Sequence, residues 1–123
     1  MPNILLVEEL EMCRDMLPRR LKRKGFNIAV AREGSEVIKM AQSEYPDLIL
    51  NNMDLAVKNG QTAIKELKAD DATKSIPIIA LTRYESDIEQ AYAVGCDDYE
   101  PVPIELPRLL EKIHKWLSTR DNK

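Results

Sequence analysis

The sequence lacks several residue patterns, and each absence excludes a class of protein. Its 123 residues include two cysteines, one histidine and four isolated glycines. Cys13 and Cys96 have neither the spacing of a metal site nor a base beside them, so we expect two small buried hydrophobic residues. His114 falls in a helical pattern near the C-terminus, where a surface residue is expected, and it is assigned no catalytic role. Because the glycines form no G-x-G-x-x-G arrangement, the chain has no dinucleotide phosphate cradle of that type.

Long apolar runs and long runs of one charge are also missing. No run approaches the roughly 18 apolar residues of a membrane helix, and the apolar residues 4–7 are too few for a signal peptide, so we expect a cytoplasmic protein with no membrane contact. The net charge is −3, from 18 basic and 21 acidic residues. The one basic cluster, at residues 19–24, precedes Gly25 and suits the end of a helix. This placement argues against direct nucleic-acid binding.

The sequence does contain short apolar runs that alternate with helical patterns. Its length fits one domain, which we expect over residues 1–119, with a frayed tail at 120–123. Strands are expected at 4–7, 26–31, from 47, 76–81 and 98–102, and helices at 10–24, from 34, from 59, 85–94 and from 106. The alternation predicts an α/β fold, a doubly wound, mainly parallel five-stranded sheet covered by five helices. Pro18 falls inside the first helix and should bend it or split off its first turns.

Polar residues gather where these strands end. Glu8 and Glu9 follow the first strand, Asn52 and Asp54 follow the third, and Thr82 ends the fourth. The carboxyl ends of parallel strands meet at one edge of a sheet, and ligands bind in the crevice outside that edge. Any chemistry is therefore expected there.

These strand ends, taken in order, resemble the receiver domain of two-component response regulators over essentially the whole chain. The resemblance rests on four segments: residues 4–9, 46–50, 76–82 and 95–99. It implies the flavodoxin-like receiver fold with strand order 2-1-3-4-5. A typical receiver takes a phosphoryl group from a phosphohistidine partner onto an aspartate after the third strand.

The resemblance also assigns roles to individual positions. Glu8 and Glu9 match the acidic pair that holds Mg²⁺ in the family, and Thr82 and Tyr99 match the threonine and aromatic residue that report phosphorylation. The peptide bond between Val102 and Pro103 resembles the family's lysine–proline bond, which is commonly cis. We therefore expect a cis bond before Pro103, against the small intrinsic preference for trans.

Two positions depart from the family. Asn52 stands where the phosphoacceptor aspartate is expected, and Val102 stands where the lysine is expected. A lost lysine hydrogen bond to a charged group costs roughly 1.5 to 3 kcal/mol, but an amide has no carboxylate oxygen to attack phosphorus. Replacing both members of a charged pair is often nearly neutral for stability. The sequence thus predicts a stable domain that is not an enzyme and not phosphorylated at the usual place.

The acidic crevice leaves other hypotheses open. Glu8, Glu9, Asn52 and Asp54 could supply oxygen ligands to Mg²⁺, but Glu9 is one methylene longer than the usual aspartate and one charge is gone, so we expect weak or no Mg²⁺ binding and no other cofactor. A second hypothesis is phosphorylation at Asp54, or at Glu8 or Glu9, although catalytic geometry tolerates little displacement. A third is a cation or small-molecule sensor that uses the same crevice.

The favoured hypothesis is a phosphorylation-independent, receiver-like signalling module that acts by protein–protein interaction in a two-component-type pathway. In the family, the face of the fourth helix, fifth strand and fifth helix pairs with a protein partner or with itself. Here that face would contain Tyr84, Ile88, Tyr92, Tyr99 and Pro101. The helical spacing of Ile88 and Tyr92 nevertheless favours a core position for both.

Overall fold

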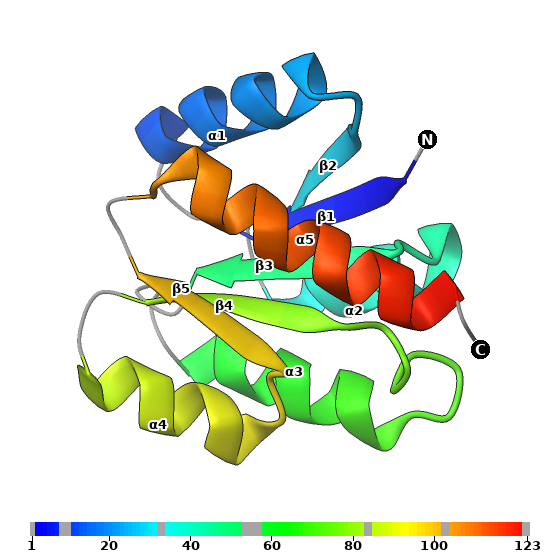
Figure 1. Ribbon diagram of the computed structural model, residues 1–123. Helices are drawn as coiled ribbons and strands as arrows, with labels where there is room; N and C mark the ends of the chain where they lie inside the picture. The colour runs from blue at the N-terminus through cyan, green and yellow to red at the C-terminus, as the bar shows by residue number, and fades with distance from the viewer. Residues whose placement is uncertain are drawn as a thin grey trace.

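The chain alternates five strands with five helices (Figure 1). The computed structural model describes residues 2–7, 11–31, 34–52, 58–82, 85–101 and 104–121, with backbone alone at 11–16, 34, 52, 58–61 and 119–121. In chain order the elements are β1 (Asn3–Val7), α1 (Glu11–Arg23), β2 (Asn27–Ala31), α2 (Gly34–Glu44), β3 (Leu48–Asn52), α3 (Lys58–Ala69), β4 (Ile78–Thr82), α4 (Glu85–Val94), β5 (Asp98–Pro101) and α5 (Leu106–Asp121). The expected elements are confirmed, and their described boundaries agree to within two residues.

The sheet is parallel throughout and has the order β2-β1-β3-β4-β5. The doubly wound fold with strand order 2-1-3-4-5 is therefore confirmed. The inner strands are apolar because helices cover both faces of the parallel sheet. Residues 4–7 of β1 and all of β4 are buried. The edge strands β2 and β5 are only partly buried.

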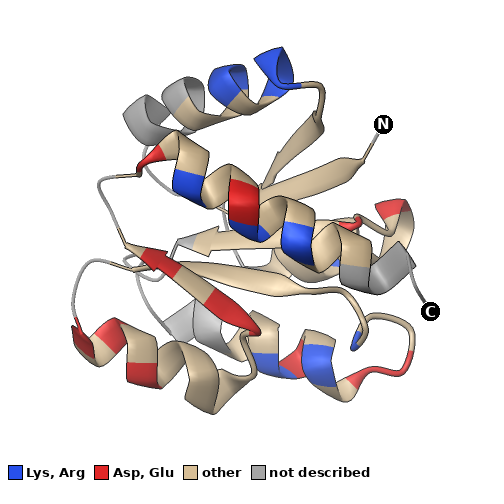
Figure 2. Ribbon diagram, in the orientation of Figure 1, with Lys and Arg blue, Asp and Glu red and all other residues tan. Residues whose placement is uncertain are grey.

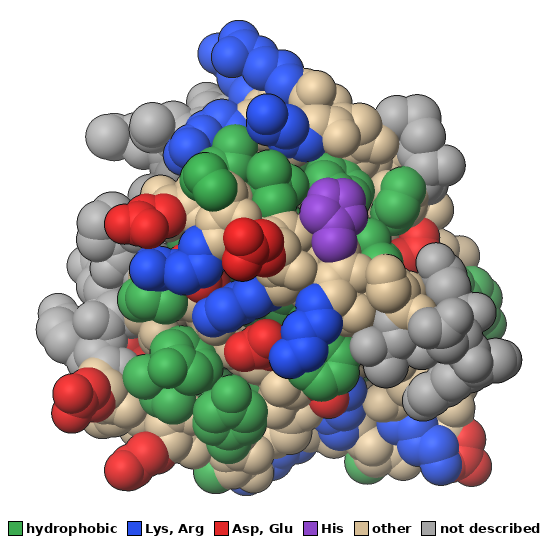
Figure 3. All heavy atoms as spheres, in the orientation of Figure 1, with side chains coloured by type: hydrophobic (Ala, Val, Ile, Leu, Met, Phe, Trp, Pro, Cys, Tyr) green, Lys and Arg blue, Asp and Glu red, His purple; other side chains and the backbone are tan. Residues whose placement is uncertain are grey.

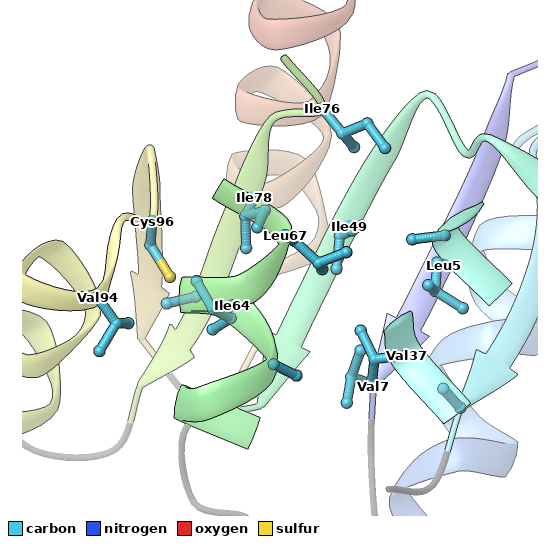
Figure 4. Packing of buried hydrophobic residues seen from close by; sticks show 14 of the residues in the cluster. Leu5, Val7, Val37, Ile49, Ile64, Leu67, Ile76, Ile78, Val94 and Cys96 are labelled. Atoms are coloured by element: carbon cyan, nitrogen blue, oxygen red, sulfur yellow. The ribbon is translucent and has the colours of Figure 1, made fainter. Parts of the chain in front are cut away.

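Alternate strand residues enter two separate cores, because successive side chains of a strand point to opposite faces. One core joins Leu5, Ile49 and Ile78 to buried side chains of α2, α3 and α4 (Figure 4). The other joins Leu6, Leu50 and Leu81 to buried side chains of α1 and α5. Helices α1 and α5 thus cover one face of the sheet, and α2, α3 and α4 cover the other (Figure 1).

The sequence predicts that Pro18 bends the first helix or splits off its first turns, and the second of these alternatives is wrong. Helix α1 (Glu11–Arg23) is unbroken with Pro18 inside it, and the bend stays a prediction. The ring is buried, and the missing hydrogen bond to residue 14 is one bond within a 13-residue helix. Helix α5 continues to Asp121, because no glycine or proline follows Pro107. The frayed tail expected at 120–123 stays a prediction.

No helix in the described ranges is long and apolar enough to cross a membrane.

Helices α1 and α4 end in the same glycine cap. Gly25 and Gly95 have φ values of 97° and 110°, and in each case the next residue donates a backbone hydrogen bond five positions back, Phe26 to Leu21 and Cys96 to Ala91. The two sites differ in their surroundings. A Cβ at Gly95 would lie 2.9 Å from Lys68 Cγ, whereas a Cβ at Gly25 would meet nothing within 4 Å.

Gly95→Ala should therefore destabilise the protein more than Gly25→Ala. The left-handed conformation costs an alanine about 1 to 2 kcal/mol at either site. At Gly95 the new Cβ also displaces Lys68, which weakens the hydrogen bonds from Lys68 Nζ to Asp97 Oδ2 (2.8 Å) and to the Ile76 carbonyl (2.9 Å). The total loss of unfolding free energy for Gly95→Ala is then about 2 to 3 kcal/mol. Urea denaturation at unchanged m-value measures both losses. Equal losses would mean that Lys68 moves aside at no cost.

Candidate functional site at the carboxyl edge of the sheet

The candidate site lies at the carboxyl ends of β1, β3, β4 and β5, which share one edge of the sheet. Asn52 ends β3 in register with Leu81 of β4. Thr82, the next residue of β4, is in register with Pro101 of β5 and is 2% exposed. The sheet therefore places the backbone of the expected acceptor position beside the strand that carries the expected switch threonine.

Much of the expected crevice falls outside the described residues. This holds for Glu8, Glu9, Asp54, Val102 and Pro103, while Asn52 is described by its backbone only. Tyr84 of the expected interaction face also lies outside the described residues. The acidic pocket, the position of the missing lysine and the cis peptide bond stay predictions. Within the described ranges, no group of three or more His, Cys, Asp or Glu side chains could hold a metal ion.

Sequence reasoning missed the main polar feature near this edge, a buried carboxylate on β5. Glu100 is 0% exposed and faces α5. Arg108 Nε donates to its Oε2 at 2.6 Å, and Lys112 Nζ lies 3.0 Å from Oε1, an ion-pair distance without the alignment of a hydrogen bond. The bond to Glu100 raises the pKa of the Arg108 guanidinium above its usual value, so Arg108 stays charged.

Lys112 also links α5 to the residues beside Glu100. Its ammonium donates to the Tyr99 carbonyl, lies 4.8 Å from the centroid of the Tyr99 ring and lies 4.0 Å from Asp98 Oδ1. One turn further along α5, Trp116 Nε1 donates to Asp98 Oδ2 at 2.9 Å. Residues 98, 99 and 100 of β5 are thus all bonded to α5. We call Asp98, Glu100, Arg108, Lys112 and Trp116 the β5–α5 network.

Tyr99 packs against Tyr92 of α4 on the other side of β5. The two ring centroids are 6.2 Å apart and the rings are nearly perpendicular, at 85°, a favourable edge-to-face pair. The expected core position of Tyr92 is wrong, because its side chain is 48% exposed. Ile88 is half-buried and Pro101 is exposed. The helical spacing misled because Ala91 and Val94 fill the inner side of α4 and leave Tyr92 outside.

The histidine and the described cysteine behave as expected. Cys96 is 5% exposed, and burial raises the pKa of its thiol to about 12, so it stays protonated and unreactive at neutral pH. His114 is exposed, with its ring centroid 5.9 Å from that of Phe26. The side chain of Cys13 lies outside the described residues.

The comparisons with known proteins now decide the family. A family model described as the response regulator receiver domain matches residues 4–114. The chain belongs to this family. It is 31% identical to the polar-differentiation response regulator DivK of Brucella ovis and 32% identical to that of Brucella anthropi, with 94% of this chain and 95% of each relative covered.

Solved receiver structures agree with this assignment. The receiver domain of sensor histidine kinase PA1611 from Pseudomonas aeruginosa has a TM-score of 0.88 at 27% identity, covering 95% of this chain and 98% of that one. The receiver domain of Ssk1 from Saccharomyces cerevisiae, crystallised with the phosphotransfer protein Ypd1, gives 0.84 at 25%, covering 97% and 92%. The chain is therefore a receiver domain of two-component signalling, and receiver domains are signalling modules that interact with protein partners.

Proposed function

We propose that this receiver domain signals by protein–protein interaction without being phosphorylated. The proposal rests on Asn52, the last residue of β3, which lies at the edge of the sheet where ligands bind in such folds. An amide is not a nucleophile toward phosphorus and cannot form an acyl phosphate. Its neighbour Asn51 is only 2% exposed and is also an amide, so β3 has no carboxylate at its end.

The missing lysine and the β5–α5 network support the same proposal. In the family, the lysine after the fifth strand contacts the acceptor and the phosphoryl group, and here that residue is Val102. In this chain β5 is instead held by Glu100, Arg108 and Lys112, contacts that need no phosphoryl group. A stable arrangement of β5 against α5 is therefore available without modification.

The proposal also includes an interaction face, a protein partner and a cellular location. The interaction face consists of α4, β5 and α5 and includes Tyr84, Ile88, Tyr92, Tyr99 and Pro101. Among the similar structures, Ssk1 is seen in complex with the protein Ypd1, which supports a protein partner rather than a nucleic acid or a membrane. We further propose a cytoplasmic location, and weak or no Mg²⁺ binding by Glu8, Glu9, Asn52 and Asp54.

Incubation with acetyl phosphate and Mg²⁺, followed by intact mass measurement, tests the proposal. The expected result is an unmodified protein, because the acceptor position offers no carboxylate. A receiver with an aspartate at the acceptor position, treated in parallel, controls for the quality of the reagent.

A phosphoryl adduct would overturn the proposal. Loss of that adduct in Asp54→Asn would place the modification at Asp54. Loss in Glu8→Gln or Glu9→Gln would place it on the acidic pair.

A further inference from the structure

Helix α4 presents an acidic stripe that contains an exposed tyrosine. Glu85, Glu89 and Tyr92 follow one another at intervals of four and three residues, so they share a face, and all three are exposed. The helix contains no lysine or arginine. Glu85 lies in the first turn, where a negative charge suits the helix dipole, but Glu89 lies beyond that turn, and like charges four residues apart destabilise a helix by a few tenths of a kcal/mol. Helix stability alone therefore does not explain Glu89.

The basic residues of the neighbouring helix do not neutralise the stripe. Arg108 and Lys112 are paired with Glu100 of β5, Arg108 by a hydrogen bond and Lys112 by an ion pair. No ion pair joins either Glu85 or Glu89 to a described side chain. Figure 2 shows the result: α4 carries acidic bands and no basic ones.

The two tyrosines of this surface contact each other. Tyr99 contacts both the Lys112 ammonium and the ring of Tyr92, which it meets edge to face. Partial burial, together with the nearby Asp98 carboxylate, raises the pKa of Tyr92 above its usual value, so its ring stays neutral at physiological pH. In Figure 3, hydrophobic side chains flanked by acidic ones gather over α4 and β5, at the lower left. Rigid tyrosines lose little conformational entropy on binding and are frequent hot spots of interfaces.

We propose that this surface, defined by Glu85, Glu89, Tyr92 and Tyr99, binds a basic segment of another protein. The inference rests on the proposed function and names the chemistry of its partner. A carboxylate accepts two hydrogen bonds from an arginine, and the exposed ring of Tyr92 attracts the same guanidinium, whereas the Tyr99 ring already contacts Lys112. Arginine is therefore the residue that both parts of the surface recognise, and lysine is the weaker alternative.

A second copy of this chain is the competing occupant. Residues 19–24 carry five cations, and none of them is in an ion pair with a described side chain. These cations lie at the end of α1, on the opposite side of the molecule from α4 (Figure 2). A contact between the two patches would be head-to-tail and would build open chains instead of a closed dimer. A separate partner forms a finite complex, and we favour it for that reason.

The test uses a blocked helical peptide of about 15 residues with arginines along one face and leucines between them. It is titrated into the full ¹⁵N-labelled chain at an ionic strength of about 0.15 M, where distant charges are screened. Amide shifts confined to α4 and β5 are expected. Glu89→Lys and Tyr92→Ala should each weaken binding about tenfold.

Two controls separate recognition from general attraction between opposite charges. Glu44→Lys makes the same charge change at an exposed residue of α2, and its affinity should stay within about twofold of the original, as expected for a distant screened charge. The same peptide with glutamates in place of arginines should not bind. Equal weakening by Glu44→Lys and Glu89→Lys, or shifts spread over the whole protein, would overturn the inference.

Sedimentation of the chain alone tests the competing occupant. A monomer at high concentration supports a separate partner. Salt-sensitive oligomers that Glu89→Lys dissociates would show a second copy on the surface and overturn the inference. These outcomes are independent of phosphorylation: an acetyl phosphate adduct refutes the proposed function alone, and failure of the peptide to bind refutes this inference alone.

Discussion

Replacing Asn52 by aspartate is expected to give the chain a phosphoacceptor that it otherwise lacks. The change supplies a carboxylate oxygen at the end of β3, the strand position of the family's nucleophile. Asn52→Asp should acquire one phosphoryl group from acetyl phosphate and Mg²⁺, while the unchanged chain acquires none. Intact mass measured against time gives both the extent and the rate.

The double variant Asn52→Asp with Val102→Lys separates the two missing residues. A lysine hydrogen bond to a charged group is worth roughly 1.5 to 3 kcal/mol, so the double variant should react about ten to a hundred times faster than Asn52→Asp alone. Val102→Lys alone should remain unmodified. Mg²⁺ should raise the melting temperature of the Asn52→Asp variant and leave that of the unchanged chain where it is, because a third carboxylate completes the ligand set. An Asn52→Asp variant that stays unmodified would mean that the crevice has lost more than its nucleophile.

The architecture could be predicted from local patterns because each strand and helix carries its own signal. Residues 4–7 are uniformly apolar, as a strand buried on both faces requires, and Ala63, Ile64 and Leu67 repeat at helical spacing and are all buried in α3. Tyr92 shows the limit of such patterns. Its spacing fits the inner face of α4, but Ala91 and Val94 occupy that face, and periodicity alone does not separate residues one position apart.

The β5–α5 network could not be predicted, because its partners are distant in sequence. A glutamate within a four-residue strand is typical of an exposed edge, and β5 is an edge strand. Glu100 is buried only because α5 crosses this strand and brings Arg108 and Lys112 to its carboxylate. The only sequence feature that points to this network is the pair of cations 8 and 12 residues after Glu100. That spacing indicates an ion pair only when the position of α5 on the sheet is known.

Lys112→Ala should lower the free energy of unfolding by about 3 kcal/mol, the lower end for breaking a buried ion pair, because the fully buried carboxylate of Glu100 keeps only Arg108 as a counter-charge. The Tyr99 carbonyl loses a donor at the same time. Glu100→Leu should cost less, about 1 kcal/mol, because the side chains of the two cations it releases are 44% and 24% exposed and can turn into water. Urea denaturation of both variants at unchanged m-value measures the difference.

A third variant, Lys112→Met, distinguishes a buried charge from ordinary packing. If the network stabilised only by contact area, Lys112→Met would cost little, because methionine keeps most of the side-chain length and removes only the charge. Charge burial predicts a loss close to that of Lys112→Ala, and it also predicts that Glu100→Leu combined with Lys112→Met is close to neutral. Glu111→Ala, one residue from Lys112 on an exposed part of α5, is the matched control and should change the unfolding free energy by less than about 0.5 kcal/mol. A larger loss for Glu100→Leu than for Lys112→Ala would show that the carboxylate itself, not its compensation, holds β5 against α5.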